Sequence, residues 1–301
     1  MEFEPVGFIG LGNMGGRMSR CIVRAGGTVL GYDVNPEVIR DAGAEPAPSI
    51  GELTEACETV LLSLPDSRVV ETVVLGDEGV LAHVKPGQVV VDLSTSSPES
   101  TRMICALLSQ KEAHYLDAGI SGGAAAADVG KLTLMVGGDE QALEKVRPTL
   151  DSFAANLFHV GGPGTGHTTK LLNNFLNAVS LAATAEIMVA GKKAGLNLAV
   201  LLEVINKSSG VNFATLNRFP KIITGDYLKG GLTNMLMMKD VILYTELTAQ
   251  LGVASLNSAG PLASFGLANA LGYANEISNT VVDALGDISG GVRLCDPEDE
   301  P

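Results

Sequence analysis

Short apolar runs alternate with helical patterns of hydrophobic residues through the first half of the chain. The apolar runs predict strands at residues 6–10, 28–33, 59–64, 88–93, 114–118 and 132–136. Helical patterns lie between them, for example at 98–110 and 140–151. Such alternation is typical of an α/β fold with a doubly wound, largely parallel sheet. A sheet of this kind binds its ligand beyond the carboxyl ends of its strands.

The pattern becomes helical after the glycine-rich segment 161–166, and no convincing strand follows. Breaks at Gly195, Gly210, Gly225 and Gly230 separate the expected helices. We therefore predict an α/β domain over residues 1–162 and an all-α domain over 163–292 that begins with a long interdomain helix. The remaining segment, 293–301, is acidic and is expected to be disordered.

The long apolar stretch at 171–190 requires a choice between a buried helix and a membrane span. It is interrupted by Asn173, Asn174, Asn177, Ser180 and Glu186. Because a membrane span needs about 20 predominantly apolar residues, we expect a buried helix of a soluble protein and no membrane partner.

The first strand candidate ends in a glycine-rich turn that leads directly into a helical pattern. The turn reads Gly10-Leu11-Gly12-Asn13-Met14-Gly15 and forms a GxGxxG motif. The three glycines permit a tight turn, close approach of a pyrophosphate and close helix–strand packing, respectively. The following helix presents free N–H groups to phosphate. We therefore expect a Rossmann-type, dinucleotide-binding domain in which these six residues contact the cofactor.

An acidic residue ends the second strand candidate, where a dinucleotide-binding domain contacts the adenosine ribose. Asp33 there is able to accept hydrogen bonds from the ribose hydroxyl groups and would repel a 2′-phosphate. No cation follows it in Val34-Asn35-Pro36. The prediction is NAD in preference to NADP, and the alternative is that Asp33 only caps the helix expected at Pro36.

Composition narrows the function further. The 301 residues carry a net charge of −14 without a basic patch, which argues against nucleic acid as a partner. The four cysteines are scattered, as expected for buried thiols in a reducing cytoplasm, and no signal peptide is expected. The four histidines, His83, His114, His159 and His167, have no ligand spacing, so no metal is predicted.

Four further segments carry polar residues and glycines in a distinctive order. They are Asp92–Thr101, Asp117–Gly123 with 130–138 after it, Gly164–Asn174, and Met238-Lys239-Asp240. Together with the glycine-rich turn they resemble the β-hydroxyacid dehydrogenase family, which includes 3-hydroxyisobutyrate dehydrogenase and tartronate semialdehyde reductase. The resemblance covers about residues 5–291.

Lys170 and Asn174 are the residues on which the chemistry is expected to depend. They are four residues apart in a helical pattern and so share one helix face. A buried lysine has a lowered pKa, which suits proton transfer with a substrate hydroxyl. The resemblance implies that Lys170 is the general acid/base and that Asn174 orients the substrate. A lysine that extends to solvent at a helix start is the simpler alternative. His167, three residues before Lys170, is near enough to affect the pKa of that lysine, but a residue in this position more often caps a helix or contacts solvent.

The resemblance assigns the other segments to ligands. It implies that Ser121, Gly122 and Gly123 bind the acid group of the substrate; an ordinary strand-to-loop turn is the alternative. Thr95 is expected to contact cofactor or substrate, with Ser96 and Ser97 better placed to cap the helix at Pro98. The resemblance places the Leu64-Pro65 loop over the cofactor and Lys239 on its nicotinamide side. Its neighbour Asp240 is able to pair with Lys239 or to orient the helix. Taken alone, Lys239-Asp240 would be a solvated helix face.

The chain departs from the family pattern at its substrate-facing positions. Where the family commonly has Asp-Ala-Pro-Val-Ser-Gly-Gly, this chain has Gly119-Ile120 in place of Pro-Val, and Gly119 permits a different backbone path. Residues 124–127 are alanines where a glycine is usual, and Gly231-Leu232 replaces a glycine–aromatic pair. A substrate other than 3-hydroxyisobutyrate is consistent with these changes.

The sequence thus predicts NAD-dependent oxidation of a small 3-hydroxy acid, or reduction of the matching aldehyde or keto acid. The partners expected are a small-molecule carboxylate substrate and a second copy of the chain, as a homodimer or homotetramer. The alternatives are an imine or ketone reductase on the same scaffold, a dehydrogenase of phosphorylated sugar acids, and a non-catalytic NAD-binding protein.

Overall fold

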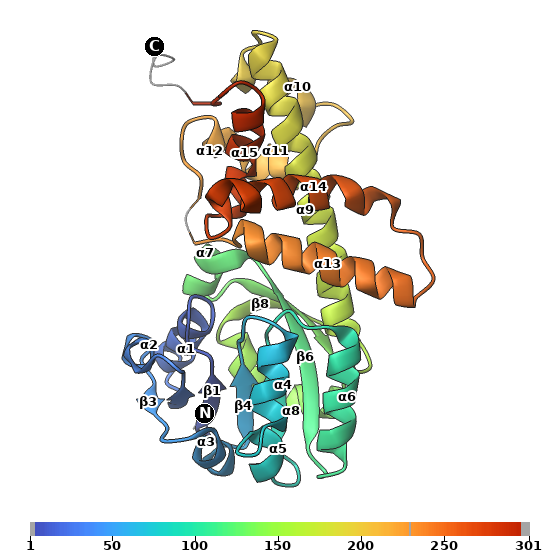
Figure 1. Cartoon of the computed structure of the whole chain (residues 1–301). Helices are drawn as coiled ribbons and strands as arrows, with labels where there is room; N and C mark the ends of the chain where they lie inside the picture. The colour runs from blue at the N-terminus through green and yellow to red at the C-terminus, as the bar shows by residue number, and fades with distance from the viewer. Residues whose placement is uncertain (1–3, 229, 296–301) are drawn as a thin grey trace. The chain divides into compact units, whose positions relative to one another are not determined.

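The computed structural model describes residues 4–228 and 230–295 (Figure 1). The chain divides into two compact units, Met1–Lys170 and Leu171–Pro301. The division falls within helix α9 (Thr165–Lys193), slightly later along the chain than the boundary expected at 162.

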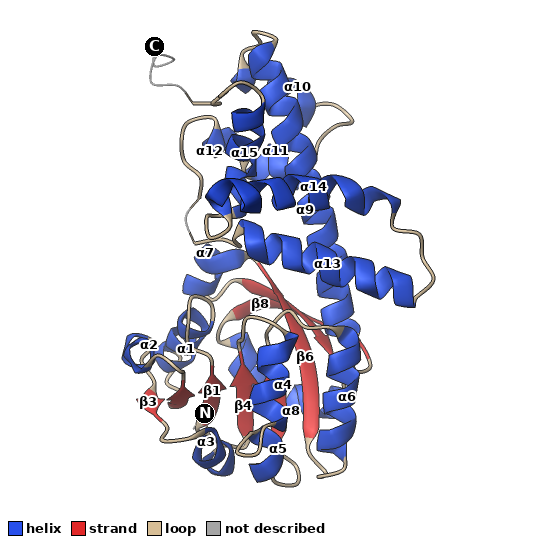
Figure 2. Ribbon diagram, in the orientation of Figure 1, coloured by secondary structure: helices blue, strands red, loops and turns tan. Residues whose placement is uncertain are grey.

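A sheet of eight strands forms the centre of the first unit, in the order β3-β2-β1-β4-β5-β6-β7-β8 (Figure 2). All neighbouring pairs are parallel except β6 and β7, which are antiparallel. The strands are β1 Val6–Ile9, β2 Val29–Tyr32, β3 Glu45–Pro46, β4 Thr59–Leu62, β5 Val89–Asp92, β6 His114–Ser121, β7 Leu132–Gly137 and β8 Ala154–Gly161. The predicted doubly wound, Rossmann-type fold is confirmed.

Six of these strands coincide with predicted ones, and two were missed. β3 has only two residues, one of them Pro46, so it leaves no pattern that could be read. β8 lies at the other edge of the sheet, and most of its side chains are partly or fully exposed. Its residues therefore lack the apolar run that marks a buried strand.

Apolar side chains alternate between the two faces of the sheet. Leu61 of β4 packs in one cluster with Met18 and Leu143, whereas Val60 and Leu62 join a second cluster on the other face. Helices on both faces contribute to these cores: α1 Gly15–Arg24, α2 Pro36–Asp41, α3 Ile50–Ala56, α4 Ser67–Leu75, α5 Val80–His83, α6 Pro98–Ser109, α7 Gly123–Asp128 and α8 Glu140–Asp151. The period of two along each strand produces this two-sided burial.

The second unit is helical throughout the part of the chain that the structure describes. After α9 come α10 Leu198–Asn206, α11 Phe213–Asn217, α12 Phe219–Ile222, α13 Asn234–Gln250, α14 Ala259–Ala268 and α15 Val281–Ile288, with shorter turns η1 Leu256–Ser258, η2 Asn269–Tyr273 and η3 Ser278–Thr280. Buried Phe219, Phe265 and Met237 belong to one core cluster. The predicted all-α second domain is confirmed, with its glycine breaks between helices.

Two expectations about apolar and acidic segments have structural outcomes. Among the described helices, α9 is long and apolar enough to cross a membrane, but half of its most apolar window is buried in the protein, as in core helices of globular domains. The disordered segment expected from 293 is wrong in its first residues. Leu294 is buried in the helical core and Arg293 bonds to Asp287. Residues 296–301 lie outside the described residues.

Candidate active site

The glycine-rich turn between β1 and α1 has the geometry that its sequence predicts. Gly10 has a φ of +88°, and a Cβ on Gly15 would lie 1.9 Å from the carbonyl oxygen of Gly10. Both positions therefore exclude any side chain. A Cβ on Gly12 would meet nothing within 4 Å. Open space at Gly12 beside a tightly packed turn is what close approach of a pyrophosphate requires.

Asp33 holds this turn in place. Its Oδ2 accepts a hydrogen bond from the backbone N–H of Leu11 at 2.7 Å, and its Oδ1 accepts one from Asn35. The alternative that Asp33 caps α2 is wrong, because the side chain of Asn35 caps that helix through the N–H of Glu37. Asp33 therefore joins the end of β2 to the turn after β1.

The turn lies where the strand order reverses, because β1 lies between β2 and β4 and the chain continues outward on both sides. Crevices at such points bind nucleotides. The first turn of α1 has no side-chain cap and no acidic residue, which leaves its positive end suited to phosphate. After β4, the N–H of Leu64 donates to Ser94 Oγ at 2.9 Å and Pro65 follows. The residues present fit a dinucleotide.

Polar residues follow β5 and β6 at the same edge of the sheet. Ser97 caps α6 through the N–H of Glu99, which leaves the half-buried Thr95 outside the cap, as predicted. β6 continues to Ser121, and Gly122 and Gly123 follow with φ values of +122° and +69°. Both glycines are exposed, and a Cβ on Gly123 would meet nothing within 4 Å. The backbone at this strand end is therefore open to a small ligand.

Lys170, in the second turn of α9, lies against β6. The half-buried side chain donates from Nζ to the carbonyl oxygen of Ile120 at 2.5 Å. This places its ammonium group beside the residue that precedes Ser121. A Cβ on Gly119 would lie 2.5 Å from the Cβ of Lys170. The expected change of backbone path at Gly119 is wrong: the residue pairs regularly with Met135, and its missing side chain makes room for α9.

Asn174 belongs to a buried polar group within the helical unit. Its Nδ2 donates to Asp240 Oδ2 at 2.5 Å, and Asp240 Oδ1 lies 3.1 Å from Lys239 Nζ. Asp240 is 1% exposed, so a solvated helix face at Lys239-Asp240 is the wrong interpretation. The rings of Phe175, the residue after Asn174, and Tyr244, one turn after Asp240, stack with centroids 3.7 Å apart. The link from Asp240 to Asn174 was not predicted, although a carboxylate on an apolar helix was a signal for it.

Two buried residues beside Lys170 were also missed. His167 is 0% exposed and neither caps the helix with its side chain nor contacts solvent, contrary to expectation. Its backbone N–H donates to Asp117 Oδ2 at 2.7 Å. Burial raises the pKa of the Asp117 carboxyl, and the neighbouring His167 opposes that shift. Asp117 lies within β6 and His167 in the first turn of α9, and no periodicity distinguishes either residue from its neighbours.

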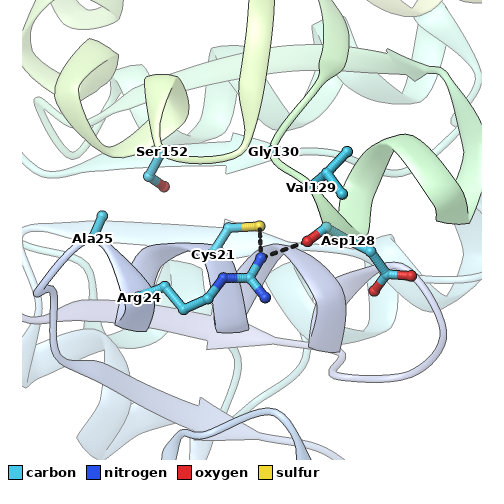
Figure 3. A pocket seen from close by; sticks show the side chains of 7 residues that line it. All are labelled: Cys21, Arg24, Ala25, Asp128, Val129, Gly130 and Ser152. Carbon is cyan, nitrogen blue, oxygen red and sulfur yellow. Dashed lines mark hydrogen bonds between the residues drawn. The ribbon is translucent and has the colours of Figure 1, made fainter.

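A surface pocket at the far end of α1 contains none of the predicted site residues (Figure 3). The Arg24 side chain crosses it and donates to Cys21 Sγ and to the carbonyl oxygen of Asp128. This arrangement ties α1 to α7 within the nucleotide-binding fold. It has no link to the glycine-rich turn, which is at the other end of the helix.

Comparisons with known proteins agree with these features. Residues 5–161 match the family described as the NAD binding domain of 6-phosphogluconate dehydrogenase, and residues 164–281 match NAD-binding of NADP-dependent 3-hydroxyisobutyrate dehydrogenase. An NAD-dependent L-serine dehydrogenase of Pseudomonas aeruginosa is 39% identical over 86% of this chain and 90% of its own. A 2-(hydroxymethyl)glutarate dehydrogenase of Eubacterium barkeri is 34% identical over 95% and 96%.

Solved structures give the same picture. The 3-hydroxyisobutyrate dehydrogenase of Mycobacterium tuberculosis, solved with L-serine, superposes with a TM-score of 0.83 at 29% identity and covers 94% of this chain and 99% of that one. Three imine reductases are 17–20% identical and share the fold alone. The turn at Gly10–Gly15, the helical second unit and the full-length relatives lead to one assignment. The chain belongs to the β-hydroxyacid dehydrogenase family of NAD(P)-dependent oxidoreductases that act on a CH–OH group.

Proposed function

We propose that this protein oxidises small 3-hydroxy acids with NAD, and that Lys170 is the general acid/base. The observation that carries the proposal is the contact of Lys170 Nζ with the carbonyl of Ile120, next to Ser121. This contact supports the proposal, because it brings the Lys170 ammonium group next to the strand end at which we expect the acid group of the substrate to bind.

Each residue of the candidate site has its own role in the proposed reaction. Lys170, in its amine form, takes the proton of the substrate hydroxyl as the alcohol is oxidised and returns it in the reverse reaction. When bound, NAD supplies the hydride acceptor for the carbinol carbon. Ser121, Gly122 and Gly123 bind the carboxylate through N–H groups and the hydroxyl. Asn174, oriented by Asp240, donates a hydrogen bond to the substrate.

The names of the relatives suggest the substrate class. L-Serine, 2-(hydroxymethyl)glutarate and 3-hydroxyisobutyrate share the skeleton HO–CH₂–CH(X)–COO⁻ and differ only in X. We propose the same skeleton for the substrate of this chain. Gly119-Ile120 and Gly231-Leu232, which depart from the family pattern, are the positions expected to select X.

The cofactor preference rests on Asp33. Its carboxylate lies at the end of β2 and bonds to the turn at Leu11. A 2′-phosphate near it would meet a like charge, and no arginine follows Asp33 in Val34-Asn35-Pro36. We therefore propose NAD over NADP, with Leu64, Pro65 and Thr95 lining the cofactor beyond the turn and Lys239 at its nicotinamide side.

The exposed apolar side chains and the cysteines support our proposals on assembly and location. Large apolar side chains are exposed on the helical unit, among them Leu176, Val204, Phe213 and Leu256. Burial of such side chains between copies supports a homodimer or homotetramer. Free cysteines, of which Cys21 and Cys57 are buried, are consistent with the reducing cytoplasm.

The test is NAD reduction, followed at 340 nm, with a panel of HO–CH₂–CH(X)–COO⁻ acids: L-serine, 3-hydroxyisobutyrate, 3-hydroxypropionate, glycerate and 2-(hydroxymethyl)glutarate. A 2-hydroxy acid, lactate, is the matched negative substrate. We expect one or more members to be oxidised and lactate to be inert. In Lys170→Ala, turnover should fall by about 10²–10⁴-fold, the typical contribution of a general acid/base. The dissociation constant of NADH, measured by fluorescence titration, should stay unchanged.

Each part of the proposal has its own contrary result. Turnover of Lys170→Ala near that of the wild type contradicts the proton-transfer role. Oxidation of lactate but of no panel member contradicts the substrate class. A lower dissociation constant for NADPH than for NADH contradicts the cofactor preference alone.

A further inference from the structure

The first turn of α9 is capped by a side chain from a different element. Asp117, a fully buried residue of β6, accepts hydrogen bonds from the N–H of Gly164 at its Oδ1 (2.8 Å) and from the N–H of His167 at its Oδ2 (2.7 Å). The residue that precedes the helix, Gly164, has no side chain with which to cap it. Because a helix start leaves several N–H groups without partners, Asp117 replaces the local cap that the sequence lacks.

Glycines bring the helix backbone into contact with the strands at the same place. A Cβ on Gly166 would lie 2.2 Å from the carbonyl oxygen of Asp117 and 2.5 Å from that of Met135. A Cβ on Gly137 of β7 would lie 2.7 Å from Asp117 Oδ1. Both neighbours are main chain or a fixed carboxylate, so neither position accepts a side chain. The start of α9 is therefore fitted to β6 and β7 without room for adjustment.

A buried polar cluster fixes the rotation of the same turn. The ring of His167 lies with Nδ1 2.7 Å from Thr101 Oγ1 of α6 and Nε2 3.8 Å from Asp92 Oδ2. Asp92 accepts hydrogen bonds from the hydroxyls of Tyr115 (2.9 Å) and Ser96 (3.1 Å). Burial raises the pKa of Tyr115 well above its ordinary value, which keeps its hydroxyl a donor. Neither end of the His167 side chain is open to solvent.

We propose that Asp117 is a positioning residue for Lys170, an inference that rests on the proposed function. A helix is stiff over one turn, so a shift of Gly164 and His167 is passed to Lys170, three residues beyond His167. The same strand that supplies the cap also supplies the carbonyl of Ile120 that receives Lys170 Nζ. β6 thus sets both the start of the helix and the end point of its reacting side chain.

The test replaces the carboxylate by an amide of the same size. In Asp117→Asn one oxygen still accepts, but the new NH₂ group faces an N–H donor, so one of the two hydrogen bonds is lost. We expect kcat to fall by about 30–100-fold, as a displacement near 1 Å costs about 100-fold, with little change in the dissociation constant of NADH. Because the Ile120 carbonyl favours the ammonium form of Lys170, a looser contact should also move the acidic limb of the kcat/KM profile to lower pH.

Gln88→Leu is the matched control for general loss of stability. Gln88 is also a buried polar residue that bonds to a helix end, since its Nε2 donates to the carbonyls of Thr54 and Cys57 at the end of α3. It precedes β5, whereas Asp117 pairs in register with the last residue of that strand. Gln88→Leu should lower the free energy of unfolding as Asp117→Asn does, but leave kcat and the pH limb unchanged.

The outcomes separate this proposal from the proposed function. An active Lys170→Ala enzyme contradicts the proposed function itself. If Lys170→Ala is inactive but Asp117→Asn keeps the wild-type kcat and pH limb, or changes them no more than Gln88→Leu does, the positioning role is refuted. Should Asp117→Asn not fold, Thr101→Val tests the same turn through His167 with a near-isosteric change. A limb shifted in the same direction supports the proposal, and an unmoved limb overturns it.

Discussion

Lys170 and Asn174 lie four residues apart on α9, yet they are held in different ways. Main-chain atoms hold Lys170: the carbonyl of Ile120 receives its Nζ, and Gly119 contacts its Cβ. Side-chain atoms hold Asn174, through the carboxylate of Asp240. The first arrangement depends on the volume between helix and strand, and the second depends on the charge of one buried group.

This difference predicts which changes each residue tolerates. Around Lys170, atoms added at Gly119 have no free space, because a Cβ there would lie 2.5 Å from the Cβ of Lys170. Around Asn174, an isosteric change of charge leaves the packing intact but alters the hydrogen bond. A variant that adds volume near Lys170 and a variant that removes charge near Asn174 therefore distinguish the two arrangements.

The largest effect is expected from Gly119→Ala. Its Cβ would lie 2.5 Å from the Cβ of Lys170 and 3.1 Å from the carbonyl oxygen of Gly166, so α9 must shift. We expect kcat to fall by about 100-fold or more and the free energy of unfolding to fall by about 1–3 kcal/mol. Steady-state kinetics and urea denaturation measure the two effects.

Gly162→Ala is the control for Gly119→Ala. Gly162 lies in the turn before α9, and a Cβ there would meet nothing within 4 Å. It should retain both activity and stability. If Gly119→Ala behaves like Gly162→Ala, the space between β6 and α9 does not set the position of Lys170.

A smaller effect is expected from loss of charge at Asp240. Asp240→Asn keeps the size of the side chain but weakens its hydrogen bond with the amide of Asn174 and removes the negative charge 3.1 Å from Lys239 Nζ. We expect kcat/KM for the acid substrate to fall about 10–100-fold, in line with about 1.5–3 kcal/mol for a hydrogen bond to a charged group. The fall should appear mainly in KM.

A double-mutant cycle with Asn174→Ala tests the link between these two residues. If Asp240 acts by orienting Asn174, the double variant should be little worse than Asn174→Ala alone. Fully additive losses would indicate that Asp240 acts through Lys239 or through stability instead.

The smallest effect is a pH dependence of stability that belongs to Asp117. Burial raises its pKa above the ordinary value of 3.8, so between those two values the folded state holds a proton that the unfolded state has lost. The stability due to the protonated form is present below pH 3.8 and is lost as the pH rises through the folded pKa. The difference in unfolding free energy between wild type and Asp117→Asn should therefore decline with rising pH. A difference that increases with pH would mean that hydrogen bonds outweigh burial at this carboxylate.

The sequence predicted the fold well because its buried strands are continuous apolar runs bounded by glycine and proline. It predicted the cofactor turn because Gly10 and Gly15 serve local needs that a short motif records. It did not predict β8, whose exposed edge position leaves no apolar run. It did not predict β3 either, because that strand has only two residues and one of them, Pro46, is typical of a break between elements.

The sequence predicted which residues belong to the candidate site better than it predicted the contacts between them. Ser121 and Lys170 were named, but the contact between Lys170 and Ile120 joins residues 50 positions apart and leaves no periodic signal. Asp117 was quoted within a motif without a role, because a side chain that caps a distant helix cannot be distinguished in the sequence from any strand residue. The sequence showed that glycine at position 119 departs from the family pattern. Only the structure showed the reason, which is the proximity of α9.

The capping of α9 by β6 has a consequence for cutting the protein into parts. A fragment of the nucleotide-binding unit that ends at residue 162 would bury the Asp117 carboxylate without either of its N–H donors, Gly164 and His167. It would also expose the backbone that Gly166 normally covers. Extension to Lys170 restores both and adds only a short piece of helix. The first compact unit, which ends at Lys170, therefore carries the proposed proton-transfer residue with it.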